Sequence, residues 1–256
     1  MICVGIDIGS ITTKAAVLRD GRLLSSAIIP TGYMAEQAGR RVYQKALGQA
    51  GIDTVAVDRI VATGYGRKLV DFAHRSVTEI TCHAAGVYFQ NPAIRSVVDI
   101  GGQDSKAIAL DGQGGVHDFA MNDKCAAGTG RFLEVMATAL ELELDAFGRL
   151  SLESDRPAVI SSLCTVFAES EVISLIAKGE RRENIIAGIH NAIAARVAAM
   201  ANRIGLAAPV MMTGGVAKNK GVVRALAQRL GHELEISALA QVNGALGAAL
   251  MAAHGR

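Results

Sequence analysis

The sequence predicts a protein of mixed α and β structure with two domains. Its 256 residues are enough for two hydrophobic cores of modest size. A hairpin-like motif with glycine at its tip occurs twice, and segments with helical apolar spacing follow the second copy. Half of the residues are hydrophobic, a fifth are charged and the formal net charge is +2, which is typical of a soluble globular protein. Because the chain has no basic arm or aromatic stacking surface, we expect no nucleic-acid partner.

The first expected element is a strand, "ICVGI", close to the N-terminus. The segment has no basic flank and no cleavage site of small residues after its apolar run, so it does not have the pattern of a signal peptide. We therefore expect a cytoplasmic protein.

The repeated motif predicts two β-hairpins. "DIGSITTKAAVLRDG" begins at Asp7 and "DIGGQDSKAIALDG" at Asp99, and both have lysine at the eighth position and an apolar strand that ends in Asp-Gly. Glycine lets a backbone approach an anion, and loop N–H groups, hydroxyls and lysine attract phosphate oxygens. An aspartate at the end of the first strand is a suitable ligand for Mg²⁺. One copy alone would indicate only a strand end and a turn, but two copies in matching register favour a phosphate site.

Two cysteines precede segments of helical apolar spacing: Cys125 in "NDKCAAGTGRFLE" and Cys164 in "CTVFAESEVISL". The apolar positions are Phe132, Val135, Met136, Ala139 and Leu140 after the first cysteine, and Phe167, Val172, Ile173 and Ile176 after the second. We expect both thiols just ahead of helices, because the free N–H groups and the dipole of a helix N-terminus favour a thiolate or another anionic centre. Helix N-termini that point at a redox centre stabilise its more negative, reduced form. Turning these helices away would therefore make its electron more reducing.

The other two cysteines are expected to be core residues. Cys3 lies in the first strand and Cys82 in the expected helix "CHAAGVYF". The four cysteines are far apart and form no CxxC pair, so stable disulfides are not expected in a reducing cytosol. His83 follows Cys82, but a lone Cys-His pair is a weak metal signal, and we interpret His83 as a core or surface histidine.

The C-terminal third predicts a buried helix and a third glycine motif. "IIAGIHNAIAARVAAMANRIGL" contains too many polar residues for a membrane span, so we interpret it as a core helix. "PVMM" and "TGGVAKNKGVVRALAQRLG", residues 213–231, predict a strand, paired glycines and an amphipathic helix whose N-terminus can face a ligand. The chain has neither a GxxxxGK[ST] loop nor a GxGxxG motif, so P-loop and Rossmann sites are excluded.

Taken together, these motifs resemble a known superfamily. "DIGSITTK", "DIGGQDSK" and "MTGGVAKN" resemble the two phosphate motifs and the adenosine motif of the acetate and sugar kinases, Hsp70 and actin. "GTG" at 128–130 and "NGALGAAL" at 243–250 resemble its two connecting segments. "ATGYGR" and the two cysteine segments are similar to the ATP-dependent activators, or reductases, of 2-hydroxyacyl-CoA dehydratases and benzoyl-CoA reductases. The matching stretches run from residue 6 to residue 219.

The resemblance implies an α/β fold of two actin-like (RNase H-like) domains, each a mixed sheet flanked by helices, with a nucleotide in the interdomain cleft. The first domain is expected to comprise residues 1–92 and 238–256. The second is expected to comprise residues 93–237, which include Cys125, Cys164 and the adenosine motif.

The motifs and the resemblance assign the expected nucleotide site. Asp7 and Asp99 are assigned to Mg²⁺. The expected phosphate ligands are the side chains of Ser10, Thr12, Thr13, Lys14, Ser105 and Lys106 and the backbone of Gly9, Gly101 and Gly102. The adenosine motif contributes Gly214, Gly215 and Val216. Gln103 is also expected to bind the nucleotide. Either Gln103 or Asp104 is expected to orient the attacking water.

The resemblance further implies an ATPase coupled to electron transfer. The family's cluster ligands correspond to Cys125 and Cys164. A [4Fe–4S] cluster takes four thiolates, so we expect one cluster per homodimer, with two ligands from each chain. The expected cofactors are this cluster, ATP or ADP, and Mg²⁺. The expected partners are ferredoxin or flavodoxin as the electron source and a cluster-containing dehydratase or reductase as the acceptor, with no membrane.

Two other functions stay open from the sequence. A small-molecule kinase of the same superfamily would use Asp104 as a base toward a substrate hydroxyl. A dimer held by structural zinc would use the same four thiolates, because they suit tetrahedral Zn²⁺.

Overall fold

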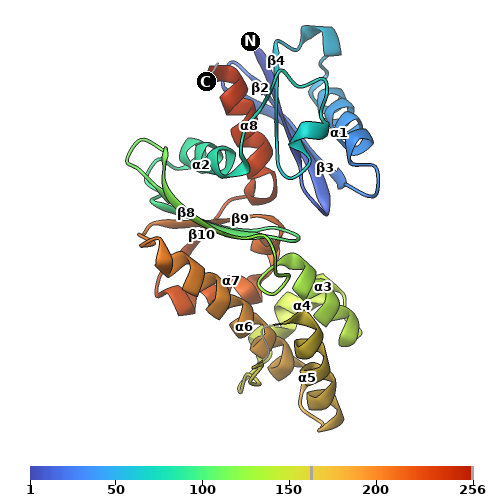
Figure 1. The fold of residues 1–256 in the computed structure, drawn as a ribbon, viewed down its shortest axis with the longest axis vertical. Coiled ribbons are helices and arrows are strands. Elements are labelled where there is room, and N and C mark those ends of the chain that lie inside the picture. The colour runs from blue at the N-terminus through green and yellow to red at the C-terminus, as the bar shows by residue number, and fades with distance from the viewer. Residues whose placement is uncertain (162–163, 255–256) are drawn as a thin grey trace. The chain divides into compact units, whose positions relative to one another are not determined.

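The computed structural model describes residues 1–161 and 164–254 (Figure 1). The chain forms two compact units. Unit 1 comprises Met1–Val97, Leu110–Asp118 and Ser237–Arg256, and unit 2 comprises Val98–Ala109 and Phe119–Ile236. Residues 255 and 256 of the expected first domain lie outside the described residues.

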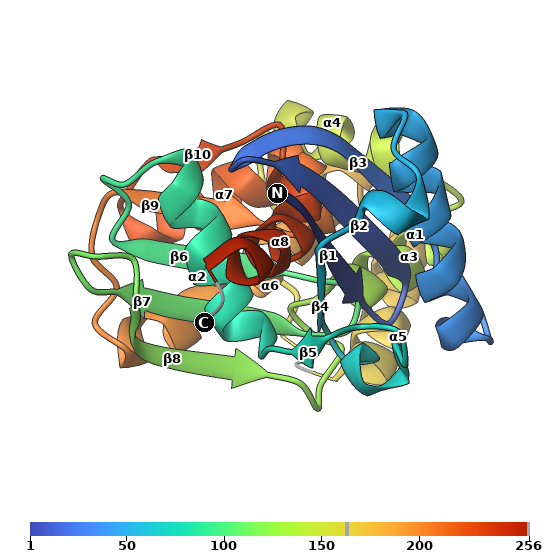
Figure 2. The same ribbon diagram turned by 90° about the horizontal axis from the view of Figure 1, so that it is seen from above.

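Unit 1 is built on a mixed five-stranded sheet. Its strands are β1 (Ile2–Ile8), β2 (Thr12–Arg19), β3 (Arg22–Pro30), β4 (Arg59–Thr63) and β5 (Arg75–Ser76), and its helices are α1 (Ala35–Ala50), α2 (Glu79–Gln90) and α8 (Asn243–His254). The strand order is β3-β2-β1-β4-β5, and Figure 2 shows these strands side by side. β1 pairs antiparallel with β2 and parallel with β4. The first predicted hairpin is therefore confirmed as β1 and β2.

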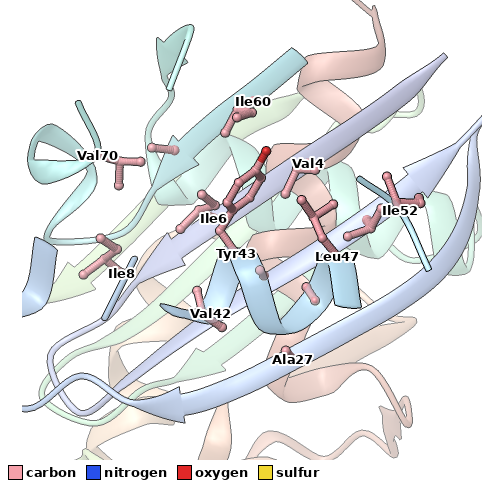
Figure 3. Packing of buried hydrophobic residues seen from close by; sticks show 14 residues of the cluster. Val4, Ile6, Ile8, Ala27, Val42, Tyr43, Leu47, Ile52, Ile60 and Val70 are labelled. Atoms are coloured by element: carbon pink, nitrogen blue, oxygen red, sulfur yellow. The ribbon is translucent and has the colours of Figure 1, made fainter. Parts of the chain in front are cut away.

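Different helices cover the two faces of this sheet. Every second residue of β1, namely Val4, Ile6 and Ile8, is buried in one cluster with Val42 and Leu47 of α1 (Figure 3). On the opposite face, β1, β2 and β4 contact α8. This alternation follows the two-residue period of a strand and places the sheet between two helical layers.

Cys3 and Cys82 are core residues, as predicted. Their exposed fractions are 1% and 0%, and they pack in one cluster with Val61 and Ala248. Burial raises the pKa of the Cys82 thiol to about 12. This thiol therefore stays protonated in the folded protein.

Glycine residues let α2 and α8 approach each other closely. A Cβ atom on Gly247 would lie 1.7 Å from the carbonyl oxygen of Cys82, and one on Gly86 would lie 2.4 Å from Oδ1 of Asn243. A backbone oxygen cannot move aside unless its helix moves, so Gly247 has no room for a side chain. Helix packing thus accounts for the small residues of "NGALGAAL".

Replacing Gly247 with alanine should destabilise the protein by about 2 kcal/mol, because α8 must move away from α2. Gly48→Ala is the matched control in α1, since a Cβ atom there meets nothing within 4 Å. The control should stabilise the protein by up to about 1 kcal/mol through helix propensity. Urea unfolding followed by circular dichroism measures both changes, and equal unfolding midpoints for the two variants would contradict the packing described.

Unit 2 contains most of the second five-stranded sheet and the helices that follow it. The strands of this sheet are β6 (Ser96–Ile100), β7 (Ser105–Leu110), β8 (Val116–Asn122), β9 (Val210–Thr213) and β10 (Leu234–Ile236), in the order β10-β9-β6-β7-β8. The helices are α3 (Gly130–Ala139), α4 (Leu144–Leu150), α5 (Thr165–Ala177), α6 (Arg182–Arg203) and α7 (Lys220–Leu230). β6 and β7 confirm the second predicted hairpin, and β10 runs parallel to β9. The α/β class with two mixed sheets is confirmed.

Helix α6 is the apolar segment that the sequence analysis places in the core. By length and hydropathy it could cross a membrane, but 72% of its most apolar window is buried inside the structure. Ile185, Ile189 and Ile193 are at most 1% exposed. The prediction of a buried helix is confirmed.

His190 of α6 is enclosed by residues of α4 and α7. Its ring packs edge-on against Phe147, with 5.4 Å between the ring centroids. Its Nε2 lies 3.4 Å from Nδ2 of Asn219, and a Cβ atom on Gly221 would lie 2.4 Å from its Nδ1. Burial lowers the pKa of His190 from 6.5 to about 3, so the folded protein holds a neutral imidazole.

His190 should make the free energy of unfolding depend on pH. Between pH 6.5 and pH 3 the unfolded state binds more protons than the folded state, so stability is lost as the pH falls through this window. At pH 5 the loss from His190 should be about 2 kcal/mol. His190→Gln does not titrate and should remove that part of the decrease between pH 7.5 and pH 5. Urea unfolding at both pH values tests this, and parallel profiles for the two proteins would contradict it.

Candidate functional site

The first candidate phosphate loop connects β1 to β2. The N–H of Gly9 donates to the carbonyl oxygen of Thr12 at 3.1 Å and closes a tight turn. Asp7 and Lys14 are register partners on the two strands, and Nζ of Lys14 lies 3.2 Å from Oδ2 of Asp7. The loop therefore has a lysine and a carboxylate at its base.

The second loop, between β6 and β7, repeats this geometry. The N–H of Gly101 donates to the carbonyl oxygen of Asp104 at 2.9 Å. Nζ of Lys106 lies 3.2 Å from Oδ2 of Asp99, which is the same distance as in the first loop. The sequence repeat is thus also a structural repeat, down to one hydrogen bond and one ion pair.

The two lysines differ in their surroundings. The side chain of Lys14 is 14% exposed, whereas that of Lys106 is 2% exposed and also pairs with Asp104 at 2.8 Å. Of the two residues expected to orient a water, Asp104 is therefore held by Lys106, while Gln103 is exposed. Lys106 supplies positive charge to its loop from below the surface.

The predicted hydroxyl ligands have different positions. Ser10 is exposed and Thr12 is half-buried, while Thr13 and Ser105 are buried. Oγ1 of Thr13 lies 2.9 Å from Oγ1 of Thr31, which donates to the carbonyl oxygen of Gly9 at 2.7 Å. Thr13 therefore braces the first loop from inside.

The third glycine motif lies against the second loop, in the same unit. Gly214 has φ of +88°, and a Cβ atom on it would lie 2.2 Å from the carbonyl oxygen of Ile100. Oγ1 of Thr213 donates to Oδ1 of Asp99 at 2.8 Å. Gly215 is exposed and Val216 is buried. This motif therefore fixes the carboxylate that the sequence analysis assigns to Mg²⁺.

Helix α3 begins on the second loop. The N–H groups of Gly130 and Arg131 donate to the carbonyl oxygens of Gly101 and Gly102 at 2.9 and 2.8 Å. A Cβ atom on Gly130 would lie 3.1 Å from the Gly101 oxygen, so this approach is tight. Two hydrogen bonds thus connect the second loop to the segment that follows Cys125.

Cys125 lies just ahead of α3, as predicted, and the Gly-Thr-Gly turn opens this helix, with Thr129 as the N-cap and Gly130 as the first residue. The first N–H groups of α3 donate to the carbonyl oxygens of the second loop. Cys125 itself lies in a turn fixed by Asn122, whose Nδ2 donates to the Cys125 carbonyl oxygen at 2.8 Å. Cys125 is half-buried, so its thiol is partly accessible.

Cys164 also lies at the N-terminus of a helix, as predicted. It is the N-cap of α5, it is exposed, and its carbonyl oxygen accepts the N–H of Ala168 at 2.9 Å. The apolar residues that predict this helix are divided between core and surface. Val172 is buried, whereas Phe167, Ile173 and Ile176 are 67%, 55% and 42% exposed.

Sequence reasoning gave no role at these loops to Thr31, Thr213 or His83. Thr31 and His83 are distant in sequence from Gly9 and Asp7, and Thr213 begins the third glycine motif but is distant from Asp99. Strand pairing and helix packing bring these residues together. Among the described residues, no group of three or more His, Cys, Asp or Glu side chains could hold a metal ion.

Comparison with known proteins identifies the family. A model of the BadF/BadG/BcrA/BcrD ATPase family matches residues 4–252. The chain belongs to this family. This protein is 49% identical over 252 residues to the activator of lactoyl-CoA dehydratase of Anaerotignum propionicum. The match covers 98% of this chain and 97% of that one.

Two solved structures share the fold of this family member. One is component A of the Acidaminococcus fermentans (R)-2-hydroxyglutaryl-CoA dehydratase, with a TM-score of 0.96, 45% identity, and coverage of 100% and 98% of the two chains. The other is the activator of the 2-hydroxyisocaproyl-CoA dehydratase from Clostridium difficile with bound ADPNP, with a TM-score of 0.94, 44% identity, and coverage of 100% and 95%. The family and fold predicted from the motifs are confirmed.

The four thiols of the metal-free protein should differ sharply in alkylation by iodoacetamide. Cys164 is exposed and Cys125 half-buried, so they should react in that order, while the buried Cys3 and Cys82 should react only after unfolding. At pH 8, a pKa near 12 leaves only about one Cys82 thiol in 10,000 ionised. Mass spectrometry of peptides after timed alkylation measures the order, and early modification of Cys82 would contradict the packing of α2 on α8.

Proposed function

We propose that this protein is an ATP-hydrolysing activator that passes a low-potential electron from ferredoxin or flavodoxin to a partner enzyme. The partner is a 2-hydroxyacyl-CoA dehydratase, a benzoyl-CoA reductase or a related cluster-containing reductase. The observation that carries the proposal is the pair of hydrogen bonds from Gly130 and Arg131 to the second phosphate loop. These bonds tie a nucleotide-binding loop to a cysteine loop within one compact unit, as coupling of ATP to electron transfer requires.

In this proposal both loops bind phosphate. Asp7 and Asp99 hold Mg²⁺, and the exposed Ser10 and half-buried Thr12 and Lys14 are direct phosphate donors. The N–H groups of Gly9, Gly101 and Gly102 are further donors, and Thr13, Ser105 and Lys106 support the loops from inside. Gly214, Gly215 and Val216 bind the adenosine. Gln103 or Asp104 orients the attacking water.

Cys125 and Cys164 fit the ligand set of an iron–sulfur cluster. Both are free thiols with accessible surface, and both lie in unit 2. Two ligands per chain match one [4Fe–4S] cluster held by a homodimer, which when bound accepts and donates one electron. Phe167, Ile173 and Ile176 are exposed apolar residues of the helix that Cys164 caps, and a second copy would cover part of them.

ATP hydrolysis acts through the loop at Gly101 and Gly102. When nucleotide binding or hydrolysis moves this loop, α3 must follow, because its first two N–H groups are bound there. The turn at Cys125 directly precedes α3 and moves with it. The position of Cys125 therefore depends on the nucleotide state. The proposed location of the protein is the cytoplasm.

Anaerobic purification of wild type, Cys125→Ser, Cys164→Ser and Cys3→Ala tests the cluster. We expect about two irons and two sulfides per chain in a dimer. Either serine variant should lose both, whereas Cys3→Ala, a core change, should keep them. Protein without iron even after reconstitution would refute the electron-transfer role, and bound zinc would indicate a structural metal site.

Asp7→Asn tests the ATPase in the same preparation. The variant should retain iron and sulfide but lose ATP hydrolysis by about 100-fold or more, because the amide is a poor Mg²⁺ ligand. Hydrolysis of ATP by the wild type without any added alcohol excludes the kinase alternative. Unchanged turnover in the variant would remove Asp7 from the site.

A further inference from the structure

The structural repeat of the two loops extends to a third strand in each sheet. β4 pairs parallel with β1 and ends at Thr63, which Gly64 follows. β9 lies next to β6 and ends at Thr213, which Gly214 follows. In both sheets, the strand beside the one that carries the aspartate therefore ends in Thr-Gly. The functions assigned above use Thr213 and Gly214 but neither Thr63 nor Gly64.

The two glycines have the same place relative to their loops. Gly64 and Gly214 have φ of +86° and +88°, a conformation that favours glycine. A Cβ atom on Gly64 would lie 2.5 Å from the carbonyl oxygen of Ile8, and one on Gly214 would lie 2.2 Å from that of Ile100. Ile8 and Ile100 are the isoleucines of the two Asp-Ile-Gly motifs. The threonines that precede these glycines are therefore structural counterparts.

In unit 2 the threonine hydroxyl is a hydrogen-bond donor to the aspartate. Oγ1 of Thr213 donates to Oδ1 of Asp99 at 2.8 Å, and Nζ of Lys106 donates to Oδ2 at 3.2 Å. Each oxygen of this buried carboxylate thus has a donor. The carboxylate cannot turn about its Cβ–Cγ bond without losing a hydrogen bond, so its orientation is fixed.

In unit 1 the corresponding threonine is present, but its hydroxyl has no partner. Lys14 is the one described residue that donates to the Asp7 side chain, at 3.2 Å to Oδ2. Oδ1 lies toward β4, since a Cβ atom on Gly64 would be 2.4 Å from it. Thr63 is the register partner of Asp7, so both side chains are on the same face of the sheet. Oγ1 of Thr63 is buried and has no hydrogen-bond partner among the described residues, which is unfavourable for a hydroxyl.

The neighbouring thiol of Cys82 does not replace a hydrogen-bond partner for Thr63. Burial raises the pKa of this thiol to about 12, and the Thr63 hydroxyl acts on it in the opposite direction. The thiol therefore stays protonated, and a protonated thiol is only a weak donor or acceptor. A carboxylate is a much stronger acceptor for a hydroxyl, and Asp7 is the one beside Thr63.

We propose that Thr63 is a positioning residue of the nucleotide site and the counterpart of Thr213. With Mg²⁺ and nucleotide bound, Oγ1 of Thr63 donates to Oδ1 of Asp7 and holds the carboxylate in the orientation that the metal requires. Lys14 is then directed to phosphate, so Asp7 needs a donor other than the lysine. This inference rests on the proposed function, which assigns Asp7 to Mg²⁺ and Lys14 to phosphate.

Urea unfolding without metal or nucleotide is the first test. Thr63→Val keeps the shape of the side chain and removes a hydroxyl that has no partner, so its unfolding midpoint should be at or above that of wild type. Thr213→Val removes a donor to the buried Asp99, so its midpoint should be lower. A decrease in Thr63→Val as large as in Thr213→Val would show that the Thr63 hydroxyl already has a structural partner, and would overturn the proposal.

Magnesium-dependent binding of a fluorescent ADP analogue to the intact protein is the second test. Thr63→Val should raise the Mg²⁺ concentration for half-maximal nucleotide binding about tenfold or more, as the loss of a hydrogen bond to a charged group predicts. Thr63→Ser keeps the hydroxyl and should stay within about threefold of wild type. Cys82→Ala removes the neighbouring thiol and should leave the curve unchanged.

The outcomes separate this inference from the proposed function. If wild type binds no nucleotide with Mg²⁺, the proposed function and this inference both fail. If wild type binds nucleotide but Thr63→Val shows the wild-type Mg²⁺ dependence, only the inference fails. It also fails if Thr63→Ser or Cys82→Ala shifts the curve as far as Thr63→Val does, because packing would then explain the effect. If circular dichroism shows that Thr63→Val is unfolded, Thr63→Ala takes its place in the comparison with Thr63→Ser.

Discussion

A buried lysine between two carboxylates sets the geometry of unit 2. Lys106 pairs with Asp99 and Asp104, and its side chain is 2% exposed. Charges removed from water must be paired and hydrogen-bonded, so the strand carrying Lys106 and the loop carrying Asp104 have little freedom relative to Asp99. Thr213 adds β9 to the same network. The carbonyl groups of the loop are thereby held in place, and α3 begins on them.

The same hairpin has different supports in the two units. Each loop has the same turn hydrogen bond and the same 3.2 Å distance between lysine and aspartate. In the first loop the lysine is more exposed, and the threonine pair of Thr13 and Thr31 supports the turn. A charge near solvent has a smaller desolvation penalty than a buried charge, and its electrostatic interactions are weaker. In the proposed nucleotide site, Lys14 would therefore contact phosphate directly, while Lys106 would support its loop.

The helix that Cys164 caps has both buried and exposed apolar residues. Ala168 and Val172 are buried, whereas Phe167, Ile173 and Ile176 are exposed. Exposed apolar side chains are unfavourable for a protein that stays alone in water. In the proposed function, a metal centre shared with a second copy and burial of these side chains would favour the same assembly.

The sequence by itself determined the two hairpins, the third glycine motif, the family and the division of the cysteines into core and accessible pairs. These features are local: strand alternation, turn glycines and motif spacing are properties of short segments. Only the tertiary structure decided that the first N–H groups of α3 donate to the second loop, that Phe167, Ile173 and Ile176 of α5 are exposed while Val172 is buried, and that His83 lies near Asp7. Each of these depends on contacts between segments far apart in the chain, where the same apolar or polar residue has a different role according to what packs against it.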